Sequence, residues 1–165
     1  MGYFLEWIEE GSLRGVVSMI NTVRVTTEEE RQAAFSIREK VFVEEQGVLL
    51  ADEFDDYDEP HEDGADHLLV YADTVPAGTG RLRVVEGEAK LERICILPSY
   101  RKHGIGRVII AALEQWAKEK GLAHAKLHGQ TQAEGFYQKL GYHTASEMFM
   151  EDGIPHVLMK KTLSE

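Results

Sequence analysis

Residues 94–121 read ICILPSYRKHGIGRVIIAALEQWAKEKG, and this stretch decides the fold. It begins with a short apolar run, continues through a turn that holds two glycines, and ends in a periodic segment. From Ile105 onward, apolar residues recur at i, i+3, i+4, i+7, i+8, i+11 and i+12, which is the spacing of one helical face. Gly121 provides a C-terminal cap. The stretch therefore predicts a strand, a glycine-containing loop and a long amphipathic helix.

The segments on either side extend this pattern. Residues 122–128 are predicted to form a strand, and the intervening helix allows it to lie parallel to the strand that ends at Leu97. Upstream, Thr27 and Glu30 match a capping box that opens a helix reaching about residue 40. The other predicted elements are strands at 22–26, 67–72, 79–85 and 90–97, turns at 75–78 and 86–88, a helix near 133–140, and a hairpin of 142–151 with 155–163. This order predicts an α/β domain with a mixed sheet.

Length and composition indicate a soluble globular protein. The chain has 165 residues, of which 43% are hydrophobic and 28% charged, so it suits one domain. Residues 1–20 lack the patterning of the rest and are predicted to be an N-terminal extension to a single domain, 21–165. No apolar stretch is long enough for a membrane span, and the acidic start is unlike a secretory signal, so the cytoplasm is expected. The single cysteine, Cys95, excludes an internal disulfide framework.

The net charge of −11 is concentrated in one segment. Nine acidic residues and no Lys or Arg lie between Asp52 and Asp66, and the remainder is nearly balanced. Without a clustered basic surface, nucleic-acid binding is not expected. The acidic segment is interpreted either as a solvated loop or as a surface that steers cationic amines. It lacks the spacing of a calcium loop, so no metal is indicated.

The loop Arg101–Gly106 joins a strand to a helix N-terminus, where free N–H groups and the helix dipole attract an anion. Its glycines would let a phosphate approach the backbone, although they could equally shape a tight turn. Arg101, Lys102 and Arg107 supply positive charge. The Walker and dinucleotide-binding patterns both fail here, because Gly106 is followed by neither Lys-Ser/Thr nor a third glycine.

Arg101-x-x-Gly104-x-Gly106 matches the R/Q-x-x-G-x-G/A signature, and the chain resembles the GNAT acetyltransferase superfamily over 21–163. Segments 34–46, 67–71 and 153–156 are more narrowly similar to the ElaA/YjcF-like bacterial subgroup. The resemblance implies the GNAT fold, with a mostly antiparallel sheet and helices on both faces. It also implies transfer of an acetyl group from acetyl-CoA, without a metal, to the amine of a small molecule or peptide.

The resemblance assigns residues to the coenzyme. The main chain of Ile94, Cys95 and Ile96 would hold the pantetheine arm. The pyrophosphate would lie on Arg101, Lys102, His103, Gly104, Ile105 and Gly106, beside Arg107. Gln130, where relatives often have asparagine, and Phe136 would complete the coenzyme site.

Catalytic groups follow from the same resemblance. Tyr137 would donate to the coenzyme sulfur, although its periodicity also suits a packed core tyrosine. Glu92 is the candidate base, with an ion pair to Arg81 or Arg93 as an equal alternative, and some family members use water instead. His67 and His156 are candidates to line the acceptor pocket. A non-catalytic acyl-CoA sensor and an interaction module, including a homodimer, remain open alternatives.

Overall fold

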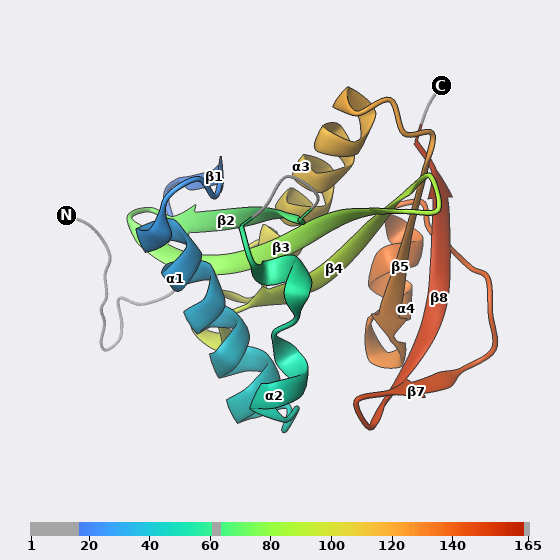
Figure 1. Cartoon of the computed structure of the whole chain (residues 1–165), viewed down its shortest axis with the longest axis horizontal. Coiled ribbons are helices and arrows are strands. Elements are labelled where there is room, and N and C mark those ends of the chain that lie inside the picture. Colours follow the sequence, from blue (N-terminus) through green and yellow to red (C-terminus); the bar gives the residue numbers. More distant parts are fainter. Residues whose placement is uncertain (1–16, 61–63, 164–165) are drawn as a thin grey trace.

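The computed structural model describes residues 17–60 and 64–163, and these build one eight-stranded sheet in the order β1-β2-β3-β4-β5-β8-β6, with β7 paired to β8 (Figure 1). The strands are β1 (Ile20–Arg24), β2 (Asp66–Ala72), β3 (Val75–Val85), β4 (Glu88–Ile96), β5 (His124–Gln130), β6 (His143–Thr144), β7 (Phe149–Glu151) and β8 (Ile154–Thr162). The helices are α1 (Glu28–Arg38), π-helical η1 (Glu39–Glu45), α2 (Leu50–Glu53), α3 (Ile105–Glu119) and α4 (Glu134–Lys139). Short 3₁₀ turns are η2 (Asp56–Asp58), η3 (Pro98–Tyr100) and η4 (Thr131–Ala133).

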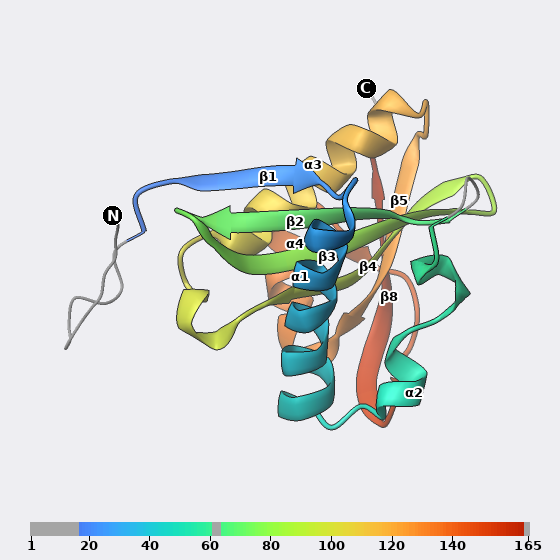
Figure 2. The same ribbon diagram turned by 60° about the vertical axis from the view of Figure 1, so that its left-hand side comes forward.

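Helices cover both faces of the sheet, as predicted (Figure 2). The side chains of β2 point alternately to the two faces and contact a helix on each. Leu69 packs with Ala34 of α1 in one cluster of buried residues. Its neighbours Leu68 and Val70 point the other way, into a larger cluster that contains Ile109 of α3. Successive side chains of a strand alternate between faces, so one strand anchors both helix layers.

The centre of the sheet is open. β4 and β5 are parallel, as predicted, and are paired only through Ala89–Ala125, Lys90–Lys126 and Leu91–Leu127. Beyond these pairs β4 continues beside β3 and β5 continues beside β8. The two strands therefore diverge, and the second half of each faces a gap.

Several predicted boundaries differ from the structure. The capping box of Thr27 and Glu30 is present, so the start of α1 is confirmed. Residues 75–78, predicted as a turn, instead begin β3, and the predicted strand 142–151 is divided into β6 and β7. The predicted extension 1–20 lies mostly outside the described residues, and its separation from the domain stays a prediction.

Candidate functional site

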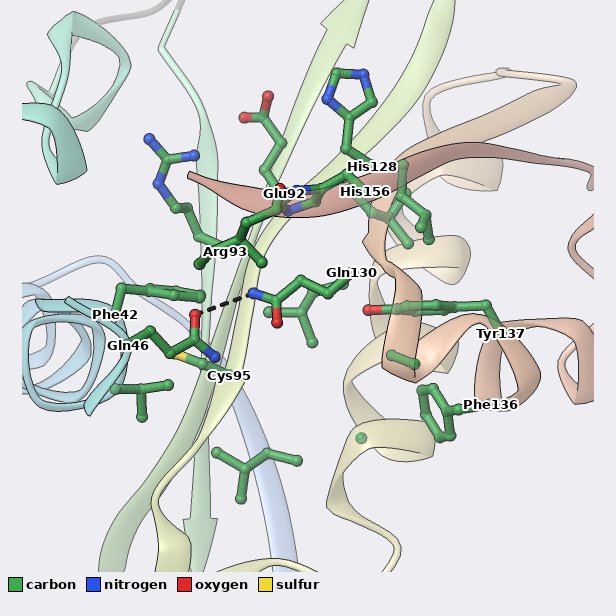
Figure 3. Close-up of a pocket in the computed structure, with 18 of the residues that line it drawn as sticks. Phe42, Gln46, Glu92, Arg93, Cys95, His128, Gln130, Phe136, Tyr137 and His156 are labelled. Carbon is green, nitrogen blue, oxygen red and sulfur yellow. Dashed lines mark hydrogen bonds between the residues drawn. The ribbon is translucent and has the colours of Figure 1, made fainter. Parts of the chain in front are cut away.

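A cavity of about 620 Å³ occupies the gap between β4 and β5. This volume is within the range of small-molecule and cofactor sites. Figure 3 shows Phe42 and Gln46 on one side, Phe136 and Tyr137 on the other, and Gln130 between them. The N-terminus of α3 lies at one end of the cavity, which brings the predicted coenzyme residues together.

The predicted phosphate loop forms the start of α3. Gly104 is the N-cap and has a φ of 80°, a left-handed conformation that favours glycine. A Cβ on Gly106 would lie 3.1 Å from the Phe136 ring, so the ring packs against bare backbone. The first N–H groups of a helix have no partner within it. All of residues 101–107 except His103 line the cavity, so the free N–H groups of the first turn lie at its edge.

Arg101 holds the loop in place. Its Nε donates to the Ile96 carbonyl at 2.9 Å, and its two terminal nitrogens contact the Glu45 carboxylate at 2.9 and 2.7 Å. The guanidinium therefore connects the loop to β4 and to η1. Positive charge for a bound anion is left to Lys102 and Arg107, both exposed at the cavity mouth.

Tyr137 projects its hydroxyl toward Gln130 in the middle of the cavity (Figure 3). The side chain is 9% exposed, and burial raises its pKa to about 12. The hydroxyl therefore stays protonated at neutral pH and serves as a hydrogen-bond donor. Gln130 itself donates to the Gln46 side chain at 3.0 Å, forming an amide bridge from β5 to the residue that ends η1. This bridge crosses the gap between the strands.

Glu92 lines the cavity, but cations surround it. Arg81 Nη2 lies 2.8 Å from its Oε1, Arg83 Nε 2.9 Å from the same oxygen, and Lys90 Nζ 3.1 Å from Oε2. Despite burial, the hydrogen bond from Arg83 and the charges of Arg81 and Lys90 lower its pKa to about 2. A carboxylate with such a low pKa is a weak base. The ion pair with Arg81, left open by the sequence, is the arrangement found.

The acidic segment contains α2 and η2, and two of its acids are buried. Arg38 contacts the Glu53 carboxylate at 3.0 Å and the Asp58 carboxylate at 2.7 Å, and all three side chains are buried. Arg81 joins Asp58 at 2.9 Å and Asp55 at 2.8 Å. Glu53 and Asp58 are therefore paired inside the protein, whereas Asp52, Asp55, Asp56 and Glu59 are exposed. The solvated-loop interpretation is wrong for the two buried acids, and the steering of cationic amines stays a prediction for the exposed ones.

The two predicted acceptor histidines have different surroundings. His67 is 5% exposed, packs edge-on against Phe35 and lies 3.8 Å from the Asp58 carboxylate. Burial lowers its pKa to about 4, and it is absent from the residues that line the cavity, so its prediction as an acceptor contact is not supported. His156 does line the cavity, and its Nδ1 lies 2.7 Å from the Ile154 carbonyl.

Two further cavity residues were not identified from the sequence. His128 Nδ1 lies 2.7 Å from Glu151 Oε1, which joins β5 to β7. The alternation of β5 is the only sequence signal, because it places His128 on the same face as Gln130. His128 and Glu151 come together because β5 and β7 both pair with β8. No local sequence pattern predicts this contact.

In residues 17–60 and 64–163, no group of three or more metal-ligating side chains is placed to hold a metal ion. The same residues contain no helix long and apolar enough to cross a bilayer.

Comparison with known proteins identifies the family. Residues 28–163 match the model of the acetyltransferase (GNAT) domain. The N-acetyltransferase YjcF of Bacillus subtilis (strain 168) is 43% identical over 143 residues, covering 86% of this chain and 99% of YjcF. Escherichia coli ElaA has a TM-score of 0.76 at 22% identity, covering 87% of this chain and 99% of ElaA.

A further solved structure shares the fold. The PaiA N-acetyltransferase from Thermoplasma acidophilum, solved in complex with coenzyme A, has a TM-score of 0.67 at 18% identity, covering 88% of this chain and 99% of PaiA. The predicted fold and the ElaA/YjcF-like resemblance are confirmed. The chain belongs to the GNAT family of acetyltransferases and is an acyltransferase.

Proposed function

We propose that the chain transfers the acetyl group of acetyl-CoA to a primary amine of a small molecule or peptide, by direct attack in a ternary complex. The observation that carries the proposal is the opening between β4 and β5, which ends at the N-terminus of α3. An extended thioester arm along Ile94–Ile96 would make the hydrogen bonds of an added strand. Its pyrophosphate would then reach the free N–H groups of Gly104–Gly106. PaiA, which has the same fold, was solved in complex with coenzyme A, and this supports coenzyme A as the ligand of the fold.

The chemistry requires a neutral amine, a stabilised tetrahedral oxyanion and a leaving thiolate. Tyr137 would donate a hydrogen bond to the departing sulfur, and this role is supported by its hydroxyl, which points into the cavity and stays protonated. The amide bridge of Gln46 and Gln130 lies over the same region and offers N–H donors. The groups deeper in the cavity, around Glu92 and His156, would surround the acceptor.

Calorimetry with acetyl-CoA, followed by free-thiol release in the presence of an amine panel, tests the proposal. We expect binding, and turnover with at least one amine. Gly106→Glu is expected to abolish binding while circular dichroism stays unchanged, because the new carboxylate would occupy the anion site beside Phe136. Ala111→Glu adds the same charge on the exposed face of α3 and should bind like the wild type. Binding without turnover of any amine would favour a sensor, and no binding would refute the proposal.

A further inference from the structure

We infer that His128, oriented by Glu151, is the general base that removes the proton from the acceptor amine, an inference that rests on the proposed N-acetyltransferase function. Both residues line the cavity, and neither belongs to the coenzyme loop. Figure 3 places His128 beside Glu92 and His156, at the end of the cavity away from Phe136.

The orientation of the His128 ring is fixed from two sides. Its Nδ1 lies 2.7 Å from Glu151 Oε1. The Phe149 ring, from the same short strand as Glu151, meets the imidazole edge-on, with ring centroids 5.0 Å apart and an interplanar angle of 79°. A ring held by one hydrogen bond and one aromatic contact has little freedom to turn, so its other nitrogen has a defined direction.

The same contact decides which nitrogen carries the proton. The hydrogen bond from His128 is the largest of the influences that lower the pKa of Glu151, so this carboxylate is ionised at neutral pH. An ionised carboxylate can only accept a hydrogen bond. The proton of the neutral imidazole therefore lies on Nδ1, and Nε2 keeps its lone pair. This is the tautomer required of a base.

A base is needed because an alkyl amine is an ammonium ion at neutral pH. Glu92 is unsuited, since cations surround it and its pKa is about 2. His156 shares the tautomer of His128, because its Nδ1 faces the Ile154 carbonyl. However, the hydrogen-bond partner of its Nδ1 is a neutral carbonyl, and the residue is only 7% exposed. His128 has a carboxylate partner that balances the charge it gains.

The step balances without any further reagent. One N–H bond of the ammonium breaks, and its proton joins His128 Nε2 while the electron pair stays on nitrogen. That pair then forms the C–N bond, the C–S bond breaks, and the electrons leave on sulfur. The second amine proton ends on the sulfur and gives the thiol. Tyr137 donates a hydrogen bond to that sulfur as it leaves and keeps its own proton overall. The His128 and Glu151 side chains are 30% and 39% exposed, so the imidazolium can return its proton to water.

Other charged groups border the same cavity and also affect how the activity depends on pH. They are Glu53 of α2, Lys90, Glu92 and Arg93 of β4, Arg101, Lys102 and Arg107 around the start of α3, Glu151 and Asp152 at the end of β7, and His156 of β8. Of these, Glu151 is the one that contacts the His128 ring within hydrogen-bonding distance.

The test compares the full chain with His128→Gln, with acetyl-CoA and either benzylamine, putrescine, glucosamine or hydroxylamine as acceptor. Hydroxylamine is largely neutral at pH 7 and needs no base. His128→Gln is expected to lower kcat by about 10²-fold for the most reactive basic amine and by less than about tenfold for hydroxylamine. The acid limb of the kcat/KM profile, the fall in rate at low pH, should move to higher pH for the basic amine, because the variant can use only the small neutral fraction of that amine. A structural role would reduce both acceptors equally, and that result would overturn the inference.

Three further variants and one spectrum sharpen the test. His124→Gln changes an exposed histidine at the far end of β5 and should behave like the wild type. Glu151→Gln should reproduce part of the loss. A larger loss with His156→Gln, together with the same shift of the acid limb to higher pH, would assign the base to His156 and overturn the inference. Long-range ¹H–¹⁵N correlation should show His128 protonated at Nδ1 without any substrate, and protonation at Nε2 would refute the orientation.

Acetyl-CoA binding and amine turnover by the wild type separate this inference from the proposed function. If the wild type binds acetyl-CoA and acetylates an amine, and His128→Gln is equally active, only the assignment of the base is overturned. A wild type that binds acetyl-CoA and acetylates no amine would overturn both.

Discussion

Replacing Glu92 with glutamine should destabilise the protein while leaving its acid–base chemistry in place. Glu92 is 7% exposed as a side chain and contacts Arg81, Arg83 and Lys90. Its pKa falls from 4.5 to about 2 in the folded protein. Each pKa unit corresponds to about 1.4 kcal/mol, so the ionised form is stabilised by about 3 kcal/mol on folding. Removing one partner of a buried ion pair costs a similar amount, about 3–5 kcal/mol.

The pH dependence has a definite sign. Because the pKa is lower in the folded state, the stabilisation is complete above the ordinary value of 4.5 and is lost as the pH falls toward 2. By pH 3 about half of it should be gone. The difference between wild type and Glu92→Gln should therefore be about 3 kcal/mol at pH 7, or roughly 10 °C in Tm, and should shrink on acidification.

Urea unfolding at pH 7, 5, 4 and 3, with Glu86→Gln as control, measures this difference. Glu86 carries the same side chain in the turn before β4 and is 83% exposed, so its loss should change stability by less than about 0.5 kcal/mol. Equal stability of Glu92→Gln and wild type, or a difference that does not change with pH, would refute the reasoning. A shift of the acid limb of the kcat/KM profile to higher pH in Glu92→Gln, with full stability, would restore Glu92 as the base.

Three further outcomes follow from other residues. Tyr137→Phe should lower kcat by about 10²-fold with unchanged acetyl-CoA binding by calorimetry, and full activity would remove its role at the sulfur. Gly104→Ala should cost about 1–2 kcal/mol in urea unfolding because of its φ of 80°, whereas Gly135→Ala, in α4 with open space around its Cβ, should be neutral or stabilising; equal effects would contradict this. Cys95 is 6% exposed and burial raises its pKa, so a thiol-reactive disulfide reagent should label it only after unfolding, and rapid native labelling would contradict the structure.

Local signals in the sequence predicted the elements that frame the site. The Thr27–Glu30 capping box and the apolar stripe beginning at Ile105 depend on contacts a few residues apart, and both are found. The parallel pairing of β4 and β5 followed from the helix between them. The divergence of these strands was not predictable from hydrophobic patterning, because it depends on hydrogen bonds that are not made.

The features that were not predicted from the sequence are contacts between side chains far apart along the chain. Arg38 and Asp58 are twenty residues apart, and a cluster of acids in that segment looks the same whether it is solvated or paired inside. The π-helical segment Glu39–Glu45 continues the pattern of α1 and brings Glu45 to Arg101. His128 meets Glu151 only because β8 lies between their strands. Such pairs are set by topology, so a linear pattern does not contain them.

The opening between β4 and β5 would couple the stability of the protein to the concentration of the ligand that fills it. A sheet that leaves its central hydrogen bonds unmade is completed by whatever occupies the gap, and a ligand that binds only the folded chain stabilises it by RT ln(1 + [L]/Kd). At a hundredfold excess over Kd this is about 2.7 kcal/mol, close to the contribution worked out for Glu92. If acetyl-CoA is that ligand, the lifetime of the protein in the cell would rise and fall with the acyl-coenzyme pool. Its melting temperature could then serve as a gauge of that pool.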